Sequence, residues 1–307
     1  MQDLSDRFHG ALLGLAVGDA LGTTVEFKSR GSFAPVTGMC GGGPFGLKPG
    51  QWTDDTSMAL CLADSLIACK GFDPADQMTR YCRWYREGYL SGTGACFDIG
   101  NTTVAALHRF ERTGDPFAGS TDANSAGNGS IMRLVPAVMF GHPDLERAVL
   151  AAGESSRTTH GARECVDACR LFGLMLFKAL DGQPKATTLF DLQDTQLSLS
   201  PKLAAIARGS YAHKQERDIR GSGYVVESLE AALWCFHTTH SYRDAVLRAV
   251  NLGDDADTTA AVCGQIAGAH YGRSGIPTDW LDQLHMRTEI ETFADALQQL
   301  RAPTDAV

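Results

Sequence analysis

The chain has 307 residues, 44% of them hydrophobic and 21% charged, with a mean hydropathy of -0.13, which is typical of a globular protein with a sizeable core. The formal net charge of -9 argues against a nucleic-acid backbone or an anionic membrane as the main partner. No segment approaches the roughly 20 uninterrupted apolar residues of a membrane helix, and the polar N-terminus does not resemble a signal peptide. We therefore expect a cytoplasmic protein.

The nine cysteines are scattered along the chain without a Cys-x-x-Cys pair. An odd number of thiols in apolar or helical surroundings is typical of reduced, buried cysteines in a cytosolic protein. This pattern favours neither a disulfide framework nor a zinc site.

Apolar residues recur with a helical period along almost the whole chain, beginning with an expected helix at 5–22. Met58, Leu62 and Leu66 follow at i, i+4 and i+8, and "KGFDP" beyond them combines a glycine stop with a proline. The remaining expected helices are 74–87, 101–112, 144–156, 162–180, 201–213, the stripe Val226, Leu229, Leu233 and Phe236, 243–250, 258–271 and 288–301. Sustained strand-type alternation is missing. The sequence therefore predicts an all-α fold, in a single domain covering 1–307.

Two segments between these helices are long, irregular and rich in glycine, namely 29–52 and 117–130. Long loops inside a compact domain often bind ligands. The helix that contains "AAVCGQIAGAHYG" at 260–272 is rich in Ala and Gly, which lets neighbouring helices approach closely. We expect that helix to be central, and the site to be assembled from loops and helix starts.

Two short runs place several carboxylates at expected helix starts. "WTDDT" at 52–56 has two aspartates and two threonines before an apolar run, and "GDDADTT" at 253–259 repeats the arrangement. Asp and Thr are common N-caps, so capping alone can explain the first run. The second run has three carboxylates within four residues, which repel one another, whereas a cap needs only one. A bound cation would remove that repulsion.

If the two runs converge, the donors are carboxylate and hydroxyl oxygens, without Cys or His. Such oxygen ligands favour Mg²⁺, Mn²⁺ or Ca²⁺ over Zn²⁺. This many carboxylates could hold more than one ion. Spacing alone does not show that runs so far apart in the chain meet in space.

With these residues in view, the chain resembles the ADP-ribosylglycohydrolase family, and especially its bacterial branch named for the dinitrogenase-reductase-activating glycohydrolase. The resemblance rests on an ordered series rather than on one motif. The series is "GALLGLAVGDALGTTVEF" (10–27), "GLKPGQWTDDTSMAL" (46–60), "DIGNTT" (98–103), "GNGSIMR" (127–133), Thr159-His160, "GYVVESLEAALW" (223–234) and "GDDADTTAAVCGQIAGAHYG" (253–272). It covers most of the chain.

The resemblance implies a compact all-α domain around a binuclear Mg²⁺ or Mn²⁺ centre that cleaves the glycosidic bond between ADP-ribose and a protein side chain. The metal ligands that it implies are Thr53, Asp54, Asp55, Asp255, Asp257 and Thr258. Each acidic run would then also cap its own helix. Glu26 corresponds to a family carboxylate beside the metals, whereas Asp19 and Asp254 are expected to play supporting roles.

Cleavage of this bond develops positive charge on the ribose, and a carboxylate must assist proton movement or stabilise that charge. Asp98 and Glu26 are the candidates outside the main ligand set, although Asp98 could instead cap the helix that follows it. Which acid donates the proton and which accepts it stays open. The resemblance favours catalysis for Asp98.

Residues for binding ADP-ribose are also implied by the resemblance. The "AGNGS" loop offers consecutive backbone N–H groups before an apolar segment, which suits a diphosphate. A turn is the alternative for this loop, a packed side chain for His160, and a core position for Tyr224 instead of stacking on the adenine. The substrate-binding candidates are Asn101, Gly127, Asn128, Gly129, Ser130, His160 and Tyr224.

The expected activity is removal of mono-ADP-ribose from arginine side chains by a monomeric enzyme with two Mg²⁺ or Mn²⁺ ions. Two alternatives keep the fold, namely hydrolysis of O-acetyl-ADP-ribose or ADP-ribosyl-serine, and a non-catalytic structural member. An unrelated dimetal phosphohydrolase fits the carboxylates but not the rest of the series. The acidic runs count against a purely structural role, because a scaffold has no reason to keep their repulsion.

Overall fold

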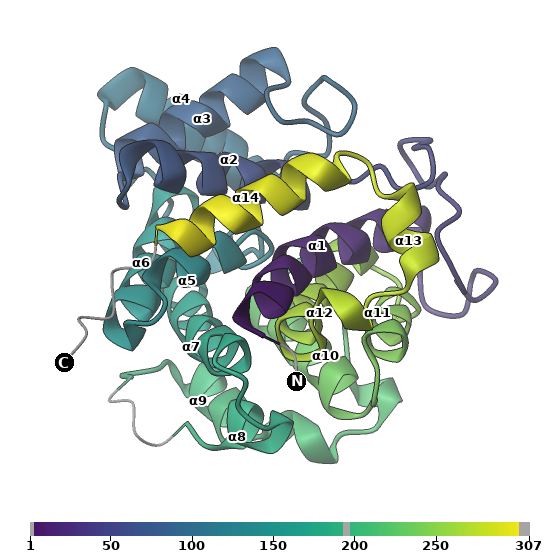
Figure 1. Cartoon of the computed structure of the whole chain (residues 1–307). Helices are drawn as coiled ribbons and strands as arrows, with labels where there is room; N and C mark the ends of the chain where they lie inside the picture. Colours follow the sequence, from purple (N-terminus) through teal and green to yellow (C-terminus); the bar gives the residue numbers. More distant parts are fainter. Residues whose placement is uncertain (1–2, 193–196, 301–307) are drawn as a thin grey trace.

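The computed structural model describes residues 3–192 and 197–300, and in this part of the chain the regular structure is helical (Figure 1). Pairing of extended backbone within these residues is limited to isolated β-bridges. The prediction of an all-α fold is confirmed. The α-helices are α1 (Leu4–Gly22), α2 (Asp54–Cys69), α3 (Pro74–Glu87), α4 (Asn101–Thr113), α5 (Val135–Gly141), α6 (Leu145–Thr159), α7 (Arg163–Leu180), α8 (Lys185–Phe190), α9 (Pro201–Ala207), α10 (Val225–His237), α11 (Tyr242–Val250), α12 (Ala256–Tyr271), α13 (Thr278–Gln283) and α14 (Arg287–Gln299).

Two of the predicted helices differ from the structure. The helix predicted at 201–213 ends at Ala207, because Gly209 takes a left-handed conformation with φ of 78° and a short 3-10 helix follows. α14 ends at Gln299, and position 301 lies outside the described residues. The sequence did not predict α5, α8 and α13, which have six or seven residues each and are too short to show a helical period.

The antiparallel pair α1 and α12 forms the centre of the molecule, and both helices are buried along most of their length (Figure 1). Their backbones approach closely because small residues face one another. A Cβ atom added at Gly264 would lie 2.1 Å from the carbonyl oxygen of Gly14, and one at Gly18 would lie 2.2 Å from that of Ala260. A larger side chain at either glycine would force the helices apart. The prediction that the Ala- and Gly-rich helix is central is confirmed.

The register of this pair brings the end of α1 next to the start of α12. A Cβ atom at Gly22 would lie 2.3 Å from the Cα atom of Asp257. Glu26 follows shortly after α1, beyond the 3-10 helix Thr23–Val25. The second acidic run is therefore held against the chain that leaves α1.

By length and composition, the segment Leu4–Val25 could also cross a membrane, since its mean hydropathy is 1.2. However, 89% of this window is buried inside the protein. Its apolar surface is already covered by other helices, as expected for the core helix of a globular fold.

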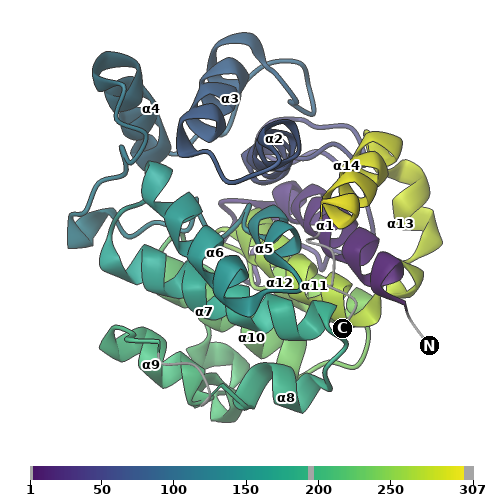
Figure 2. The same cartoon turned by 60° about the vertical axis from the view of Figure 1, so that its left-hand side comes forward.

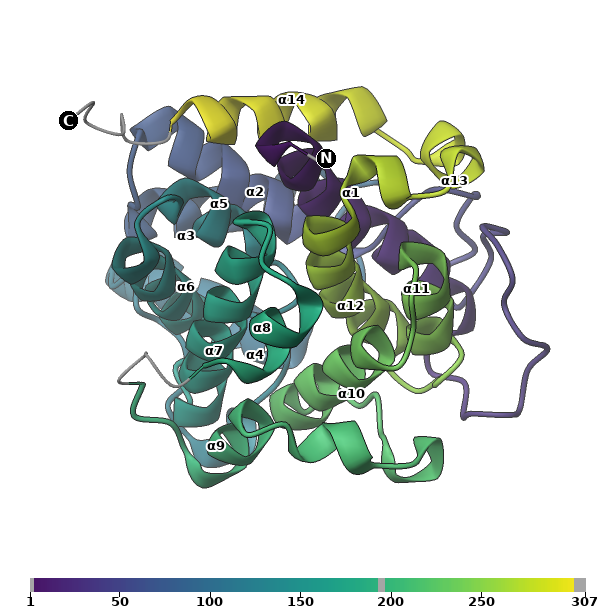
Figure 3. The ribbon, with the colours of Figure 1, turned by 60° about the horizontal axis from the view of Figure 1, so that its bottom comes forward.

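The remaining helices cover this central pair. α14 packs across α1 and α2, while α5, α6 and α7 pack together beside them (Figure 2). The predicted loop 29–52 contains no helix and projects from the molecule beyond α11 and α13, with one isolated bridge between Gly42 and Leu47 (Figure 3). The second predicted loop, 117–130, contains the 3-10 helix Ala123–Ser125.

Candidate metal and substrate site

The start of α2 is held by a carboxylate from another helix. Asp19 of α1 accepts hydrogen bonds through Oδ1 from the backbone N–H and hydroxyl of Thr53, both at 2.9 Å. Its Oδ2 accepts from the backbone N–H of Thr56 at 3.0 Å and from that residue's hydroxyl at 2.6 Å. Asp19 thus satisfies N–H groups that a local N-cap would otherwise satisfy. Asp19 therefore has a supporting role, which lies at the start of α2 and not only in the segment around Asp19 itself.

The side chains at the N-cap positions of the two acidic runs do not cap the helices that follow them. Thr53 and Asp255 occupy the N-cap positions of α2 and α12, yet the side chain of neither makes a capping hydrogen bond. The prediction that each run also caps its own helix is therefore wrong. The cap of α2 comes from α1 through tertiary packing, which the local sequence cannot reveal.

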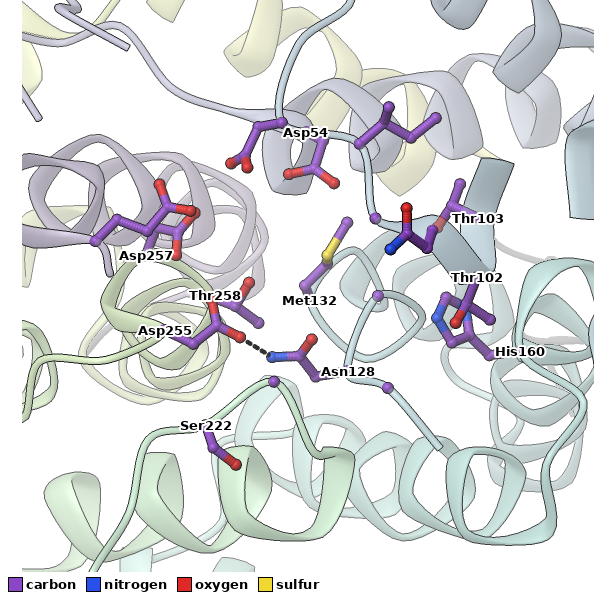
Figure 4. Close-up of a pocket in the computed structure, with 18 of the residues that line it drawn as sticks. Asp54, Thr102, Thr103, Asn128, Met132, His160, Ser222, Asp255, Asp257 and Thr258 are labelled. Atoms are coloured by element: carbon purple, nitrogen blue, oxygen red, sulfur yellow. Dashed lines mark hydrogen bonds between the residues drawn. The ribbon is translucent and has the colours of Figure 1, made fainter. Parts of the chain in front are cut away.

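The two acidic runs meet in space. The hydroxyl oxygen of Thr53 lies 3.3 Å from Oδ2 of Asp55 and 3.4 Å from Oδ2 of Asp257. The hydroxyl of Thr258 donates to Oδ2 of Asp55 at 3.2 Å, which joins α12 directly to α2. Asp54 lies at the opposite side of the cavity from Asp255 and Thr258 (Figure 4). The implied ligand residues are thus assembled around one space.

The donor set at this space fits a divalent cation. Oδ1 of Asp55 and Oδ1 of Asp257 are buried without a hydrogen-bond partner. Such buried, unpaired carboxylate oxygens are costly unless something positive lies against them. Ligand oxygens of Asp257 lie within 4.8 Å of those of Asp19 and Asp55, and also within 4.8 Å of those of Glu26 and Asp98. Carboxylate and hydroxyl oxygens are the ligands that Mg²⁺ and Mn²⁺ prefer.

Burial and mutual repulsion raise the pKa values of these carboxyls. Burial is the main cause for each, and it raises the pKa of Asp54, Asp55 and Asp257 well above the ordinary value, with further increases from neighbouring carboxylates. The pKa of Glu26 is raised to about 9 by burial and by the charges of Asp98 and its neighbours. Without a cation, the cluster therefore retains protons that ordinary carboxyls lose.

These shifts predict how the stability of the metal-free protein depends on pH. The pKa values of about 9 for Glu26 and about 7 for Asp98 lie above those of the unfolded chain, so the folded state binds more protons. The contribution of these two groups to the free energy of unfolding is therefore fully present below about pH 4 and is lost as the pH rises toward 9. The free energy of unfolding falls by about 1.4 kcal/mol per pH unit for each extra proton that the folded state binds. Melting temperatures measured in chelator from pH 5 to 9 should fall, and Mg²⁺ should flatten that fall. A metal-free protein whose stability rises over this range would contradict the assignment.

Asp98 and Glu26 form a close carboxyl pair at the side of the cavity, with one oxygen of each within 4.8 Å of the other. Asp98 is partly buried and has a left-handed backbone with φ of 59°. It does not cap α4, because Gly100 occupies the N-cap position. The capping alternative for Asp98 is therefore wrong. A non-glycine residue in this conformation is uncommon, and such strain is often concentrated at functional sites.

The cavity next to this pair has a volume of about 690 Å³, within the range of small-molecule sites. Six carboxylates lie among its described lining residues, and no lysine or arginine does; the six are Glu26, Asp54, Asp98, Asp254, Asp255 and Asp257. Asn101, Gly127, Asn128, Gly129, His160 and Thr258 also line it. The cavity therefore favours groups that carry positive charge or bind through a metal ion.

The "GNGS" loop forms one wall of this cavity. The side-chain amide of Asn128 donates to Oδ2 of Asp255 at 2.7 Å, which ties the loop to the metal-ligand cluster (Figure 4). The Ser130 side chain is buried and accepts a hydrogen bond from Ser156 at 2.9 Å, so only its backbone can serve a ligand. Behind the loop, the buried Arg133 guanidinium donates to the carbonyl oxygen of Gly129. Because a trans peptide points its C=O and N–H in opposite directions, this contact turns the N–H of Ser130 away from Arg133.

His160 lines the cavity beside this loop. Its Nδ1 lies 2.8 Å from the hydroxyl of Thr159, and burial together with the nearby Arg133 charge lowers its pKa to about 3. The imidazole is therefore neutral and acts as a polar contact rather than a cation.

The structure does not bring the Tyr224 ring into the cavity. Its hydroxyl donates to Glu164 and accepts from Lys202 at 2.6 Å, and the Lys202 ammonium lies 4.9 Å from the ring centroid. Only its backbone is close to the site, through an isolated bridge with Gly127. Tyr224 reaches the neighbouring surface of α7 and α9 instead.

Several lining residues were not singled out from the sequence. They are Phe27, Ile99, Gly100, Thr102, Thr103, Met132, Ser222 and Gly223. Most of them lie within, or next to, the quoted motifs. Nearness to a motif was therefore the signal that could have identified them as lining residues. Apart from the aromatic ring of Phe27, their side chains carry no chemistry that would have distinguished them.

Comparisons with known proteins agree with this geometry. The profile of the ADP-ribosylglycohydrolase family matches residues 1–306. The chain is similar to the ADP-ribosylarginine hydrolase Tri1 of Pseudomonas putida (strain GB-1), with 46% identity over 97% of this chain and 79% of the relative. It is 36% identical to the ADP-ribosyl-(dinitrogen reductase) glycohydrolase of Rhodospirillum rubrum, over 96% of both chains. A solved chain of an "ADP-ribosylglycohydrolase-related protein complex" is similar with a TM-score of 0.86 and 46% identity, covering 98% of this chain and 99% of that one.

Proposed function

The chain belongs to the ADP-ribosylglycohydrolase family, and on that premise we propose that it hydrolyses the N-glycosidic bond between ADP-ribose and an arginine side chain. The observation that carries this proposal is the acidic cavity lining, in which Glu26, Asp98 and Asp254 lie beside the proposed metal ligands and no described lysine or arginine is present. A guanidinium is always charged, so an arginine-linked substrate matches this lining better than a neutral serine or acetyl ester does. The relatives named ADP-ribosylarginine hydrolase support the same linkage.

We further propose two divalent ions, Mg²⁺ or Mn²⁺, held by Thr53, Asp54, Asp55, Asp255, Asp257 and Thr258. Four carboxylates in this set, two from each acidic run, support more than one ion. Asp19 lies close to Asp55 and Asp257 but is a poor candidate ligand, because both its oxygens already accept hydrogen bonds at the start of α2. When bound, such ions supply Lewis acidity and orient ribose hydroxyls.

The residues of the chain supply the other parts of the reaction. The backbone of Gly127–Ser130 binds the diphosphate, and neutral His160 provides a polar contact beside it. The Glu26–Asp98 pair can hold one proton and one negative charge together, since two adjacent carboxyls do not both ionise readily. One member of the pair can then give a proton to the departing guanidine nitrogen, while the other stabilises positive charge on the ribose. A water molecule then adds to the anomeric carbon and gives its proton to the carboxylate that donated one, which restores the pair. Burial of both carboxyls strengthens these interactions.

The test is a side-by-side assay of arginine-, serine- and O-acetyl-linked ADP-ribose at one Mg²⁺ concentration. We expect kcat/KM for the arginine linkage to exceed the others by at least about tenfold, because one hydrogen bond to a charged group is worth that much. Preference for the serine linkage would overturn the linkage proposal and leave the family unchanged. Absence of hydrolysis in all three would favour a non-catalytic member.

We also propose that the protein acts as a monomer in the cytoplasm, on ADP-ribosylated proteins. Its nine cysteines are all unpaired, which supports a reducing compartment. Size-exclusion chromatography with light scattering would test the oligomeric state.

A further inference from the structure

Phe27 is an exposed aromatic residue at the mouth of the acidic cavity. Its side chain is 68% exposed, which makes it the most exposed of the large apolar residues in the described part of the chain. Its backbone has φ of 62°, in the left-handed region that bulky side chains rarely adopt. Neither property stabilises the fold, since a glycine or asparagine at this position would relieve the strain and expose less apolar surface. Because both the exposed apolar ring and the left-handed backbone are unfavourable for stability, we infer that Phe27 has a functional role.

The backbone of Phe27 is fixed by contacts with the loop of the second acidic run. The N–H of Phe27 donates to the carbonyl oxygen of Asp254 at 2.7 Å, and the N–H of Asp254 donates to the carbonyl oxygen of Lys28 at 2.8 Å. Asp254 itself has a left-handed backbone, with φ of 57°. This reciprocal pairing connects the position of Phe27 to the chain immediately before Asp255.

The ring of Phe27 is also supported from one side by other aromatic rings. It meets the Phe45 ring edge-on, with centroids 6.5 Å apart, and Phe45 in turn lies 5.2 Å from Phe97. Phe97 directly precedes Asp98 in the chain, so this row of rings links Phe27 to the segment that carries Asp98. Such edge-to-face contacts are favourable and fix ring orientation. The large exposed fraction of Phe27 shows that much of its ring surface remains open to a ligand.

The surroundings of the open ring favour a cation. Glu26 precedes Phe27 in the chain, Asp254 pairs with its backbone, and all three line the same cavity as Asp98. An arginine guanidinium is planar and weakly hydrated, and it stacks on aromatic faces within about 6 Å of the ring centroid. A serine hydroxyl or an acetyl group has no charge to interact with the ring.

We propose that the Phe27 ring is the stacking surface for the guanidinium of the ADP-ribosylated arginine, and that it sets the preference for that linkage. This inference rests on the proposed arginine-directed activity. The free ADP-ribose product has no guanidinium, so Phe27 discriminates among substrates without holding the product.

Three substitutions at Phe27 separate stacking from other roles. Phe27→Leu keeps apolar bulk but removes the aromatic face, Phe27→Trp keeps and enlarges it, and Phe27→Gly removes the side chain and the backbone strain. We expect Phe27→Leu and Phe27→Gly to lower the ratio of kcat/KM for arginine-linked over O-acetyl-linked substrate by about tenfold, mainly through KM. Phe27→Trp should retain the ratio. Calorimetric affinity for ADP-ribose should change by less than about twofold in all three.

A stability measurement excludes a purely structural role. Phe27→Gly should raise Tm by about 2–4 °C, because the left-handed strain is removed. Lys70→Gly is the matched control, since Lys70 is exposed, lies at the C-terminal end of α2 and has φ of 50°. It should raise Tm similarly without changing the substrate ratio.

The outcomes distinguish this inference from the proposed function. If the wild-type protein does not cleave the arginine linkage, the proposed function and the inference both fail. If the wild type cleaves it and Phe27→Leu keeps the wild-type ratio, only the role of Phe27 is overturned. A fall in Tm for Phe27→Gly, with equal losses on both substrates, would identify Phe27 as a structural residue and also overturn the inference.

Discussion

Replacing Asp257 by Ala is expected to abolish hydrolysis and to remove the stabilisation of the protein by Mg²⁺. Asp257 is the residue shared by the two groups of converging carboxylates, and its Oδ1 is buried without a partner. A ligand that binds only the folded state stabilises it by about 2.7 kcal/mol at a concentration 100 times its Kd. For a chain of 307 residues, that corresponds to a rise in Tm of roughly 4 °C, which the variant should lack.

Melting temperatures of the metal-free wild type and of metal-free Asp257→Ala would distinguish loss of metal binding from misfolding. Burial and neighbouring carboxylates raise the pKa of Asp257 well above its ordinary value, so the wild-type cluster is unfavourable without a cation. Metal-free Asp257→Ala should therefore melt at the wild-type temperature or higher. Asp254→Asn is the matched control, because it removes a charge from the same loop at an exposed position, and Asn tolerates a left-handed backbone. It should keep most of the Mg²⁺-dependent rise in Tm. Unchanged turnover of chelator-treated Asp257→Ala would refute the metal-site assignment.

The second large effect is expected at Asp98. Asp98→Asn should lower kcat by about 10²–10⁴-fold, the usual contribution of a general acid or base, while the affinity for ADP-ribose is largely retained. Asn has nearly the same shape and tolerates the left-handed φ of 59° at this position, so the backbone should stay in place. What the variant loses is the charge and the ability to exchange a proton with Glu26.

Single-turnover kinetics and calorimetry would measure the two quantities separately. The pKa of Asp98 is raised to about 7 by burial and nearby carboxylates, whereas that of Glu26 is raised to about 9. Because the two carboxyls interact, these values describe the pair, which retains one proton near neutral pH. Glu26→Gln provides the comparison, since it removes the other carboxyl of the pair while Asp98 remains. Loss of ADP-ribose binding in Asp98→Asn with kcat preserved would show that Asp98 binds substrate and is not needed for the chemical step.

The helical class and most of the long helices could be predicted from the sequence. A helical period and its terminal signals are contained within a single segment of chain, so 74–87 and 162–180 could be predicted from local residues. The small residues of 260–272 also indicated close helix packing, and three acids so near one another indicated a bound cation. In each case the physical cause lies between residues that are close in the chain.

How these segments combine depends on contacts between parts of the chain that are far apart in sequence. Asp19 supplies the cap of α2 from α1, the Tyr224 ring turns toward Lys202 and away from the cavity, and Phe27 lies exposed at the cavity mouth. The convergence of Asp55 with Thr258 depends on the antiparallel register of α1 and α12, which the contact of Gly14 with Gly264 allows. Backbone contacts between distant segments leave no periodic signal in either segment. The positions of these contacts depend on how all the helices pack together into a core of close to crystal density.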